Sequence, residues 1–147
     1  MNRLFHYMDA KLFFRNIDFN TKKDTILFLC NQMLKQGYAN TEFVDSVFER
    51  EKISDTSYFN KFAIPHAIYF GSSKTCISIL INDKPIPWGY DKKVNIVILI
   101  SINEKDIQYF NPIYSALVDL LLDDVTFSEM AAIKNYDQFI NYLTHKL

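Results

Sequence analysis

The segment "NKFAIPHAI" (residues 60–68) places a histidine directly after a proline, at the end of a short apolar run. Proline has a fixed φ angle and restricts the residue before it, so the backbone leading into His66 is stiff. Histidine is a nucleophile and proton carrier near pH 7, and at a strand end it can meet solvent or a partner. From these residues alone, a presented reactive imidazole and a histidine bonded to a backbone carbonyl both stay open.

Few other groups compete for such chemistry. The remaining histidines, His6 and His145, lie near the two ends of the chain and are expected on the surface. Cys30 and Cys76 stand in apolar runs without metal-ligand spacing, so we expect small core residues in a reducing compartment. The chain has three glycines and no glycine-rich phosphate loop, which argues against nucleotide binding. We expect neither a metal nor another cofactor.

Length and charge narrow the class of protein. The 147 residues have the size of one domain and carry 16 basic and 17 acidic side chains, for a net charge of -1. This balance gives no electrostatic footprint for nucleic acid or an anionic membrane. No segment reaches the ~20 apolar residues of a membrane span, and no secretory signal opens the chain. We therefore expect a cytoplasmic domain without membrane insertion.

Helical periodicity dominates the first third of the chain. After "AKLFF", a short strand or helical turn, Thr21 and Asp24 resemble a capping box that starts a helix ending at Gly37. "NTEFVDSVFEREK" predicts a second helix, ending in Arg50 and Glu51.

The middle of the chain changes to strands, and helices return in the tail. "KTCISILI" and "VNIVILIS" have strand length, and the second is apolar enough to be buried on both faces. "NDKPIPWGYDKK" between them, with two prolines and a glycine, predicts a loop or edge segment. "NPIYSALVDLLLDD" predicts a helix that ends at Asp123 and Asp124, with Pro112 in its first turn. Thr126 and Glu129 predict a capping box for the next helix, and "YDQFINYLTHKL" predicts the last.

The region around His66 resembles the phosphorylation-site region of the mannitol/fructose-type enzyme IIA (EIIA) domains of the bacterial sugar phosphotransferase system (PTS). Arg50, Glu51 and "AIPH" match the family pattern residue by residue. "KPIPWG", "VNIVILISI" and "SALVDLLLDD" resemble its later segments, so the likeness extends from about Leu12 to Leu143. It implies a single α/β domain over residues 1–147, with a mixed central β-sheet flanked by helices on both sides.

The resemblance also implies the site residues. His66 would accept the phosphoryl group, and Arg50 would hold its equatorial oxygens as a planar five-donor cation. Glu51 lies beside Arg50, and Thr56 precedes the motif with a hydroxyl that could donate to a phosphate. A solvated helix-end arginine is the alternative for Arg50.

One position departs from the family pattern. Transport-type members carry a second active-site histidine at the start of the helix after the last long strand. That position falls on Phe110 here, with Asn111 beside it. Asn111 can donate a hydrogen bond but neither charge nor proton. We therefore expect a domain that accepts phosphate on His66 and passes it on poorly.

This departure favours a sensor. EIIA-like domains also end transcription regulators and antiterminators that contain PTS regulation domains (PRDs), and "TSYFNKFAIPHAI" resembles that branch. We expect a fragment of a larger sugar-responsive regulator, phosphorylated by HPr or an enzyme IIB (EIIB) and acting on neighbouring regulator domains rather than on nucleic acid. Its chemistry would be that of a phosphoacceptor rather than of a turnover enzyme. The alternatives are a free-standing EIIA that passes phosphate from HPr to an EIIB in sugar uptake, and a binding module that is never phosphorylated.

Overall fold

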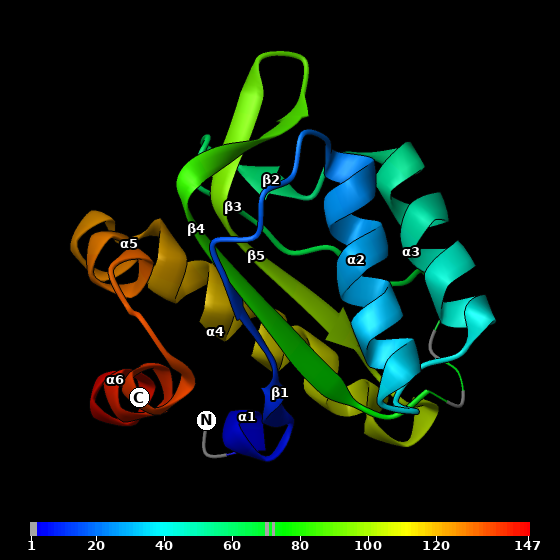
Figure 1. Ribbon diagram of the computed structural model, residues 1–147. Helices are drawn as coiled ribbons and strands as arrows, with labels where there is room; N and C mark the ends of the chain where they lie inside the picture. Colours follow the sequence, from blue (N-terminus) through cyan, green and yellow to red (C-terminus); the bar gives the residue numbers. More distant parts are fainter. Residues whose placement is uncertain (1–2, 70, 72) are drawn as a thin grey trace.

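A five-stranded sheet runs through the middle of the molecule (Figure 1), in a computed structural model that describes residues 3–69, 71 and 73–147. Its strands lie in the order β1 (Met8–Arg15), β4 (Cys76–Gly89), β5 (Lys92–Ser101), β3 (Phe62–Ala63) and β2 (Ser57–Tyr58). β1 and β4 pair in parallel, as do β3 and β5, whereas β4–β5 and β2–β3 are antiparallel. The sheet is therefore mixed, as the family resemblance implies.

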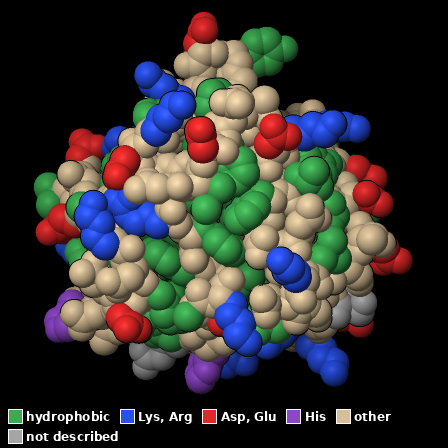
Figure 2. Space-filling view, in the orientation of Figure 1, with side chains coloured by type: hydrophobic (Ala, Val, Ile, Leu, Met, Phe, Trp, Pro, Cys, Tyr) green, Lys and Arg blue, Asp and Glu red, His purple; other side chains and the backbone are tan. Residues whose placement is uncertain are grey.

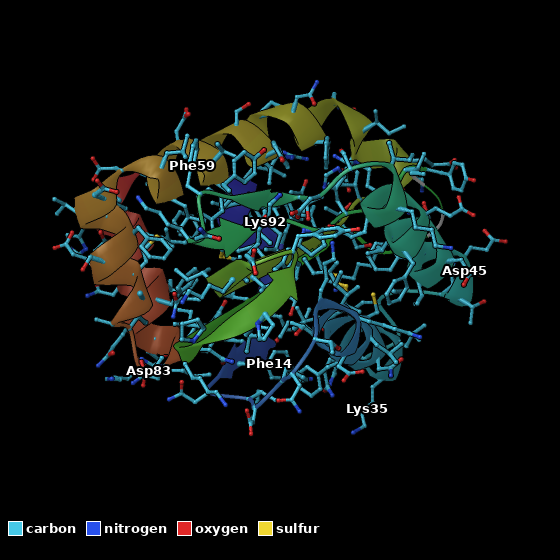
Figure 3. All side chains as sticks on the ribbon, turned by 90° about the horizontal axis from the view of Figure 1, so that it is seen from above. Phe14, Lys35, Asp45, Phe59, Asp83 and Lys92 are labelled. Atoms are coloured by element: carbon cyan, nitrogen blue, oxygen red, sulfur yellow. The ribbon has the colours of Figure 1, made fainter. Side chains whose placement is uncertain are left out.

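Helices cover both faces of this sheet. α2 (Lys22–Lys35) and α3 (Thr41–Ile53) lie on one face, and α4 (Phe110–Leu122), α5 (Asp124–Ala131) and α6 (Tyr136–Lys146) lie on the other (Figure 1). The short α1 (Arg3–His6) precedes β1, and a 3-10 turn, η1 (Glu104–Tyr109), leads into α4. Seen from above, side chains fill the space between the layers (Figure 3). The predicted single α/β domain is confirmed.

The alternation of side chains along β5 explains why both faces need cover. Ile96, Ile98 and Ile100 pack with α4, α5 and α6 on one side. Val97 and Leu99 pack with α2 and α3 on the other. Because successive strand residues point to opposite faces, an unbroken run of branched apolar residues must be buried on both.

The ends of the first two long helices follow the capping signals in part. The Thr21 hydroxyl accepts a hydrogen bond from the Asp24 amide at 3.0 Å, and Gly37 follows the helix with a φ of +74°. Asn40 caps α3 by accepting from the Phe43 amide at 3.0 Å. α3 does not end at Arg50 and Glu51, because it continues to Ile53.

The segment predicted as a loop or edge is the outer half of β4, which extends to Gly89. β1 stops pairing with β4 at Ile81, so beyond that residue one side of β4 has no neighbouring strand, and prolines are tolerated there. Tyr90 and Asp91, with φ of +41° and +61°, form a two-residue turn into β5. This hairpin projects at the top of Figure 1. Trp88, two residues before the turn, is buried.

The predicted start of α5 is wrong. Asp123 caps the helix, and the Thr126 amide and hydroxyl donate to its carboxylate at 2.9 and 2.8 Å. Thr126 therefore lies inside α5 rather than at its cap. The acidic pair that the sequence analysis placed at the end of α4 stands at the start of α5, where the helix dipole favours negative charge.

The cysteines are buried in the structure, and the two terminal histidines lie on its surface. Cys30 and Cys76 are buried, and burial raises the pKa of each thiol to about 12. His6 and His145 are exposed. On the face seen in Figure 2, basic and acidic side chains are interspersed between hydrophobic patches. No helix among the described residues has the length and apolar composition to cross a membrane.

Candidate functional site

His66 is anchored to the centre of the sheet. It forms a parallel bridge with Ile100, and the Pro65 carbonyl accepts the Ile100 amide at 3.1 Å. Pro65 lacks an amide hydrogen, so it fits the point where β3 stops after Ala63. The backbone of the histidine is thereby fixed against the central strand β5.

The imidazole of His66 has a defined tautomer. Its Nδ1 lies 2.9 Å from the Ile64 carbonyl oxygen. A carbonyl can only accept, so Nδ1 donates, and in the neutral ring the lone pair is on Nε2. The two interpretations that the sequence left open thus hold together, because Nδ1 binds a carbonyl while Nε2 has the electron pair of a nucleophile.

The surroundings keep this ring neutral. Burial lowers the pKa of His66 below its ordinary value, and the nearby Arg50 charge adds to that effect. The hydrogen bond to Ile64 and the charge of Glu51 oppose the shift without cancelling it. At neutral pH the imidazole is therefore neutral, with its proton on Nδ1, and Nε2 is able to attack.

The lowered pKa gives a testable pH dependence. We expect the NMR titration of the His66 ring to have its midpoint below ~6.5, the ordinary value for histidine. Phe110→Ala should raise that midpoint toward the ordinary value, because it removes a ring 5.1 Å from the imidazole and reduces burial. A wild-type midpoint at or above the ordinary value would contradict this account.

Two aromatic rings of α4 form the wall of the site. The ring centroids of Phe110 and Tyr114 lie 5.1 and 5.4 Å from that of His66. Phe110, the residue at the family's second-histidine position, thus contacts the imidazole directly. Asn111 is exposed beside it on the first turn of α4.

Arg50 and Glu51 point in different directions from the last turns of α3. The Arg50 Nη1 donates to the carbonyl oxygen of Ser54 at 2.7 Å and to its hydroxyl at 3.2 Å. The side chain of Glu51 is only 5% exposed and binds Lys22 Nζ at 3.1 Å. The guanidinium therefore stays near the surface of the site, whereas the carboxylate turns into the protein.

A chain of hydrogen bonds joins Glu51 to His66. The Thr56 hydroxyl donates to the Glu51 carboxylate, and the Thr56 amide lies 3.4 Å from it. The Ile64 amide donates to the Thr56 carbonyl at 3.1 Å, and the Ile64 carbonyl accepts from His66. Thr56 is 1% exposed, so the phosphate contact expected of its hydroxyl is replaced by this support of the backbone.

Removing the carboxylate should cost stability. Glu51→Ala would leave the Thr56 hydroxyl and the Lys22 charge without their partner, and we expect a loss of about 3 kcal/mol in the free energy of unfolding. Urea denaturation measures it. Glu49→Ala, which removes an exposed carboxylate from the same helix, is the control and should change stability by less than about 1 kcal/mol. Equal effects of the two substitutions would argue against the supporting role.

Tyr58 and Tyr114 were missed by the sequence analysis. Their hydroxyl groups are hydrogen-bonded to each other, although 56 residues separate them. Tyr114 follows Phe110 by four residues, a spacing that puts both on one helix face, and this signal was available. Nothing in the local pattern around Tyr58 indicates its partner.

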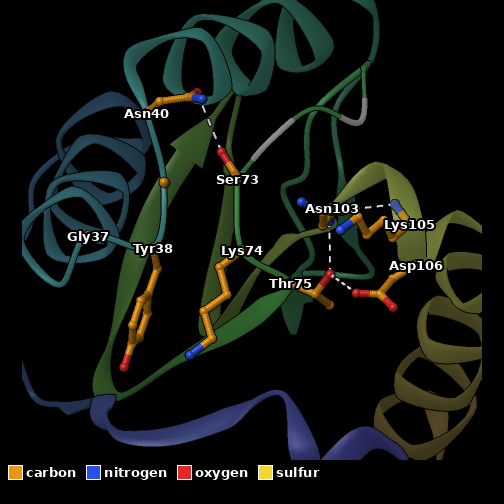
Figure 4. Close-up of a pocket in the computed structure, with 10 residues that line it drawn as sticks. Gly37, Tyr38, Asn40, Ser73, Lys74, Thr75, Asn103, Lys105 and Asp106 are labelled. Atoms are coloured by element: carbon orange, nitrogen blue, oxygen red, sulfur yellow. Dashed lines mark hydrogen bonds between the residues drawn. The ribbon is translucent and has the colours of Figure 1, made fainter.

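A separate polar pocket of about 530 Å³ lies between Tyr38, Lys74 and Asp106 (Figure 4). Its polar groups bind one another: the Thr75 hydroxyl donates to Asp106 at 2.5 Å and accepts the Asn103 amide at 2.8 Å. His66 does not line this pocket. We therefore place the candidate site at the imidazole, which lies against an aromatic wall and feels the charge of Arg50.

Known proteins of two kinds, operon regulators and phosphotransferase components, resemble this chain. Residues 6–146 match the family described as phosphoenolpyruvate-dependent sugar phosphotransferase system, EIIA 2. The chain is 27% identical over 141 residues to a probable licABCH operon regulator of Bacillus subtilis, covering 96% of this chain and 22% of the regulator. It is 30% identical over 84 residues to the mannitol-specific phosphotransferase enzyme IIA component of Halalkalibacterium halodurans, covering 55% of this chain and 57% of that protein.

Solved structures share the fold. The crystal structure of IIA mannitol from Escherichia coli aligns with a TM-score of 0.73 at 24% identity, covering 92% of this chain and 97% of the other. The nitrogen regulatory protein IIA-Ntr from Neisseria meningitidis aligns with a TM-score of 0.82 at 15% identity, covering 94% and 97%. The chain belongs to the EIIA 2 family of the sugar phosphotransferase system.

Proposed function

We propose that this chain is the phosphoacceptor domain of a sugar-responsive transcriptional regulator, phosphorylated on Nε2 of His66 by PTS proteins. The observation that carries the proposal is the pairing of a fixed imidazole with Phe110. Nδ1 of His66 is bound to Ile64 at 2.9 Å, and the second-histidine position holds a ring that has no proton or charge to offer. Such a site can receive phosphate but lacks the second imidazole that would help to pass it on.

The chemical step needs little beyond positioning. The Nε2 lone pair attacks the phosphorus of a donor phosphohistidine, the donor N–P bond breaks, and the donor imidazole recovers the electron pair. The Nδ1 proton stays on Nδ1, hydrogen-bonded to the Ile64 carbonyl. The Arg50 guanidinium has further N–H groups besides Nη1 to bind the equatorial oxygens.

HPr or an EIIB is the proposed donor. One solved structure with this fold is the complex of the Escherichia coli mannitol EIIA with phosphorylated EIIB, which supports an EIIB as the partner. Phosphorylation would add close to two negative charges to a chain whose formal net charge is -1. A change of that size can alter the contact with a neighbouring domain of the regulator.

The relatives support a regulatory role and leave one alternative. An operon regulator aligns over 96% of this chain. A mannitol-specific enzyme IIA component aligns over 55% of it, which supports a free-standing EIIA that passes phosphate from HPr to an EIIB. Phe110 favours the first of these functions over the second.

The test is a phosphorylation and chase experiment. The chain is incubated with enzyme I, HPr and labelled phosphoenolpyruvate or, in a parallel arm, with labelled phosphorylated EIIB, beside His66→Ala and a His145→Ala control. The labelled chain is then mixed with a panel of EIIB domains. We expect label on the wild type and on His145→Ala, none on His66→Ala, and retention during the chase. Prompt movement of label to an EIIB would favour the free-standing EIIA. If neither HPr nor phosphorylated EIIB labels the chain, the proposed function is wrong.

A further inference from the structure

The two tyrosines beside His66 form a hydroxyl pair that joins two elements. Tyr58 belongs to β2, where its ring stacks on Phe62 at 5.0 Å with an interplanar angle of 15°. Tyr114 belongs to the first turns of α4, and its ring plane stands at 75° to the His66 imidazole. The hydrogen bond between the hydroxyl groups therefore connects the strand side of the site to its helical wall.

The two hydroxyl groups have two O–H donors between them, and the hydrogen bond that joins them uses only one. Each phenol has one O–H, and the hydrogen bond between Tyr58 and Tyr114 uses one of the two. When Tyr58 donates, the remaining O–H is that of Tyr114. That hydroxyl belongs to the residue whose ring contacts the imidazole, so the spare donor is on the phosphoacceptor side.

The burial of Tyr114 keeps its hydroxyl protonated, and therefore a hydrogen-bond donor. Burial, followed by the hydrogen bond with Tyr58, raises the pKa of Tyr114 well above its usual value. The phenol is therefore neutral at pH 7 and has its proton. Arg50 and Glu51 act electrostatically on Tyr114 as they do on His66, which places the four groups in one neighbourhood.

We propose that Tyr114 donates a hydrogen bond to an oxygen of the phosphoryl group on His66, with Tyr58 orienting and polarising that hydroxyl. The inference rests on the proposed function, since it requires His66 to be phosphorylated. No proton leaves the phenol: the donor N–P bond breaks as the Nε2–P bond forms, and Tyr114 stabilises the charge on the oxygens. Hydrogen bonds to charged groups are about twice as strong as neutral ones, and a donor in a chain is strengthened by its neighbour.

Three matched substitutions test this role, each removing one hydroxyl and keeping its ring. Initial labelling rates are measured over a range of HPr concentrations and, in a parallel arm, of phosphorylated mannitol-type EIIB. Tyr114→Phe should lower the maximal rate about tenfold and leave the KM for the donor protein within about twofold. Tyr58→Phe should cause a smaller loss, because the Tyr114 donor remains. Tyr109→Phe should leave the rate unchanged, because the Tyr109 ring contacts Arg3 outside the site.

A second measurement separates this contact from a purely structural effect. A donor hydrogen bond favours the dianionic phosphoryl group, so the pKa read from its phosphorus-31 shift should be higher in Tyr114→Phe than in the wild type. Thermal melting identifies any variant that fails to fold. If Tyr114→Phe does so, Tyr58→Phe with its phosphorus titration takes its place, with the same direction expected.

The outcomes distinguish the inference from the proposed function. Label on wild-type His66 together with an unchanged rate and phosphorus titration in Tyr114→Phe would overturn the inference and leave the proposed function standing. A larger loss in Tyr58→Phe than in Tyr114→Phe would also overturn it, because Tyr58 would then be the donor. If wild-type His66 takes no label from either donor, both are wrong.

Discussion

Arg50→Ala is expected to slow the phosphorylation of His66 by about 100-fold. The transferring phosphoryl group spreads negative charge over its equatorial oxygens, and a nearby guanidinium stabilises that charge. The Arg50 charge already acts on His66, since it contributes to the lowered pKa of the imidazole. The measurement is the initial rate of label transfer from phosphorylated HPr or EIIB at saturating donor concentration.

The controls for this prediction lie on the same helix. Lys52→Ala removes a positive charge two residues away on an exposed part of α3, and its rate should stay within about twofold of the wild type. Arg50→Lys retains the charge and loses the planar fork, so an intermediate rate is expected. Arg50 also donates to Ser54, and thermal melting must therefore show that each variant is folded. Equal rates for Arg50→Ala and Lys52→Ala would remove Arg50 from the site.

Phe110→His is expected to speed the onward transfer of phosphate from His66 to an EIIB by about tenfold or more. The Phe110 ring lies 5.1 Å from the imidazole, so a second imidazole there would be well placed to donate to the phosphoryl oxygens. A donor that strengthens as charge develops on those oxygens lowers the barrier to transfer. The measurement is the loss of label from the chain during a chase with mannitol-type EIIB domains.

Phe110→Leu is the matched control, because it removes the aromatic ring without supplying a donor. If the leucine variant releases its phosphate as fast as the histidine variant, the effect comes from a loosened wall rather than from the new imidazole. A wild-type chain that already transfers as fast as Phe110→His would show that the aromatic ring does not limit transfer. The regulatory proposal would then lose its main support.

Much of the fold could be predicted because short stretches of sequence indicate its helices and strands. The branched apolar run of β5 indicates a strand buried on both faces, and the structure packs Ile98 and Leu99 on opposite sides. Thr21 indicates the start of α2 through a capping hydrogen bond that involves only neighbouring residues. Such features depend on short stretches of chain, so a sequence contains enough information to place them.

The failures depend on tertiary context. The prolines of the outer β4 suggest a loop until one knows that β1 stops pairing at Ile81 and leaves that edge open. Asp123 is both the C-cap of α4 and the N-cap of α5, so the two helices follow each other without a connecting loop, and the sequence indicated the end of the first but not the start of the second. In each case a neighbouring element decided the local structure.

The candidate site divides in the same way. His66, Arg50 and Phe110 follow from the resemblance, because the family pattern fixes their positions along the chain. The family pattern does not predict that Glu51 turns inward or that Tyr58 and Tyr114 form a hydroxyl pair. Both features depend on how α3, β2 and α4 meet in space. Composition alone cannot supply such an arrangement.

The anchoring of His66 has a consequence for how a phosphorylated state could be read. The backbone of this residue is bridged to Ile100 in the central strand, and its ring is bound to the Ile64 carbonyl. A phosphoryl group on Nε2 would need to break neither of these contacts, so we expect the two states to share one backbone and to differ in charge. A partner must then distinguish the two states by electrostatic potential rather than by shape. Added salt screens exposed charge over about 8–10 Å, so it would weaken this discrimination without changing the structure of the domain.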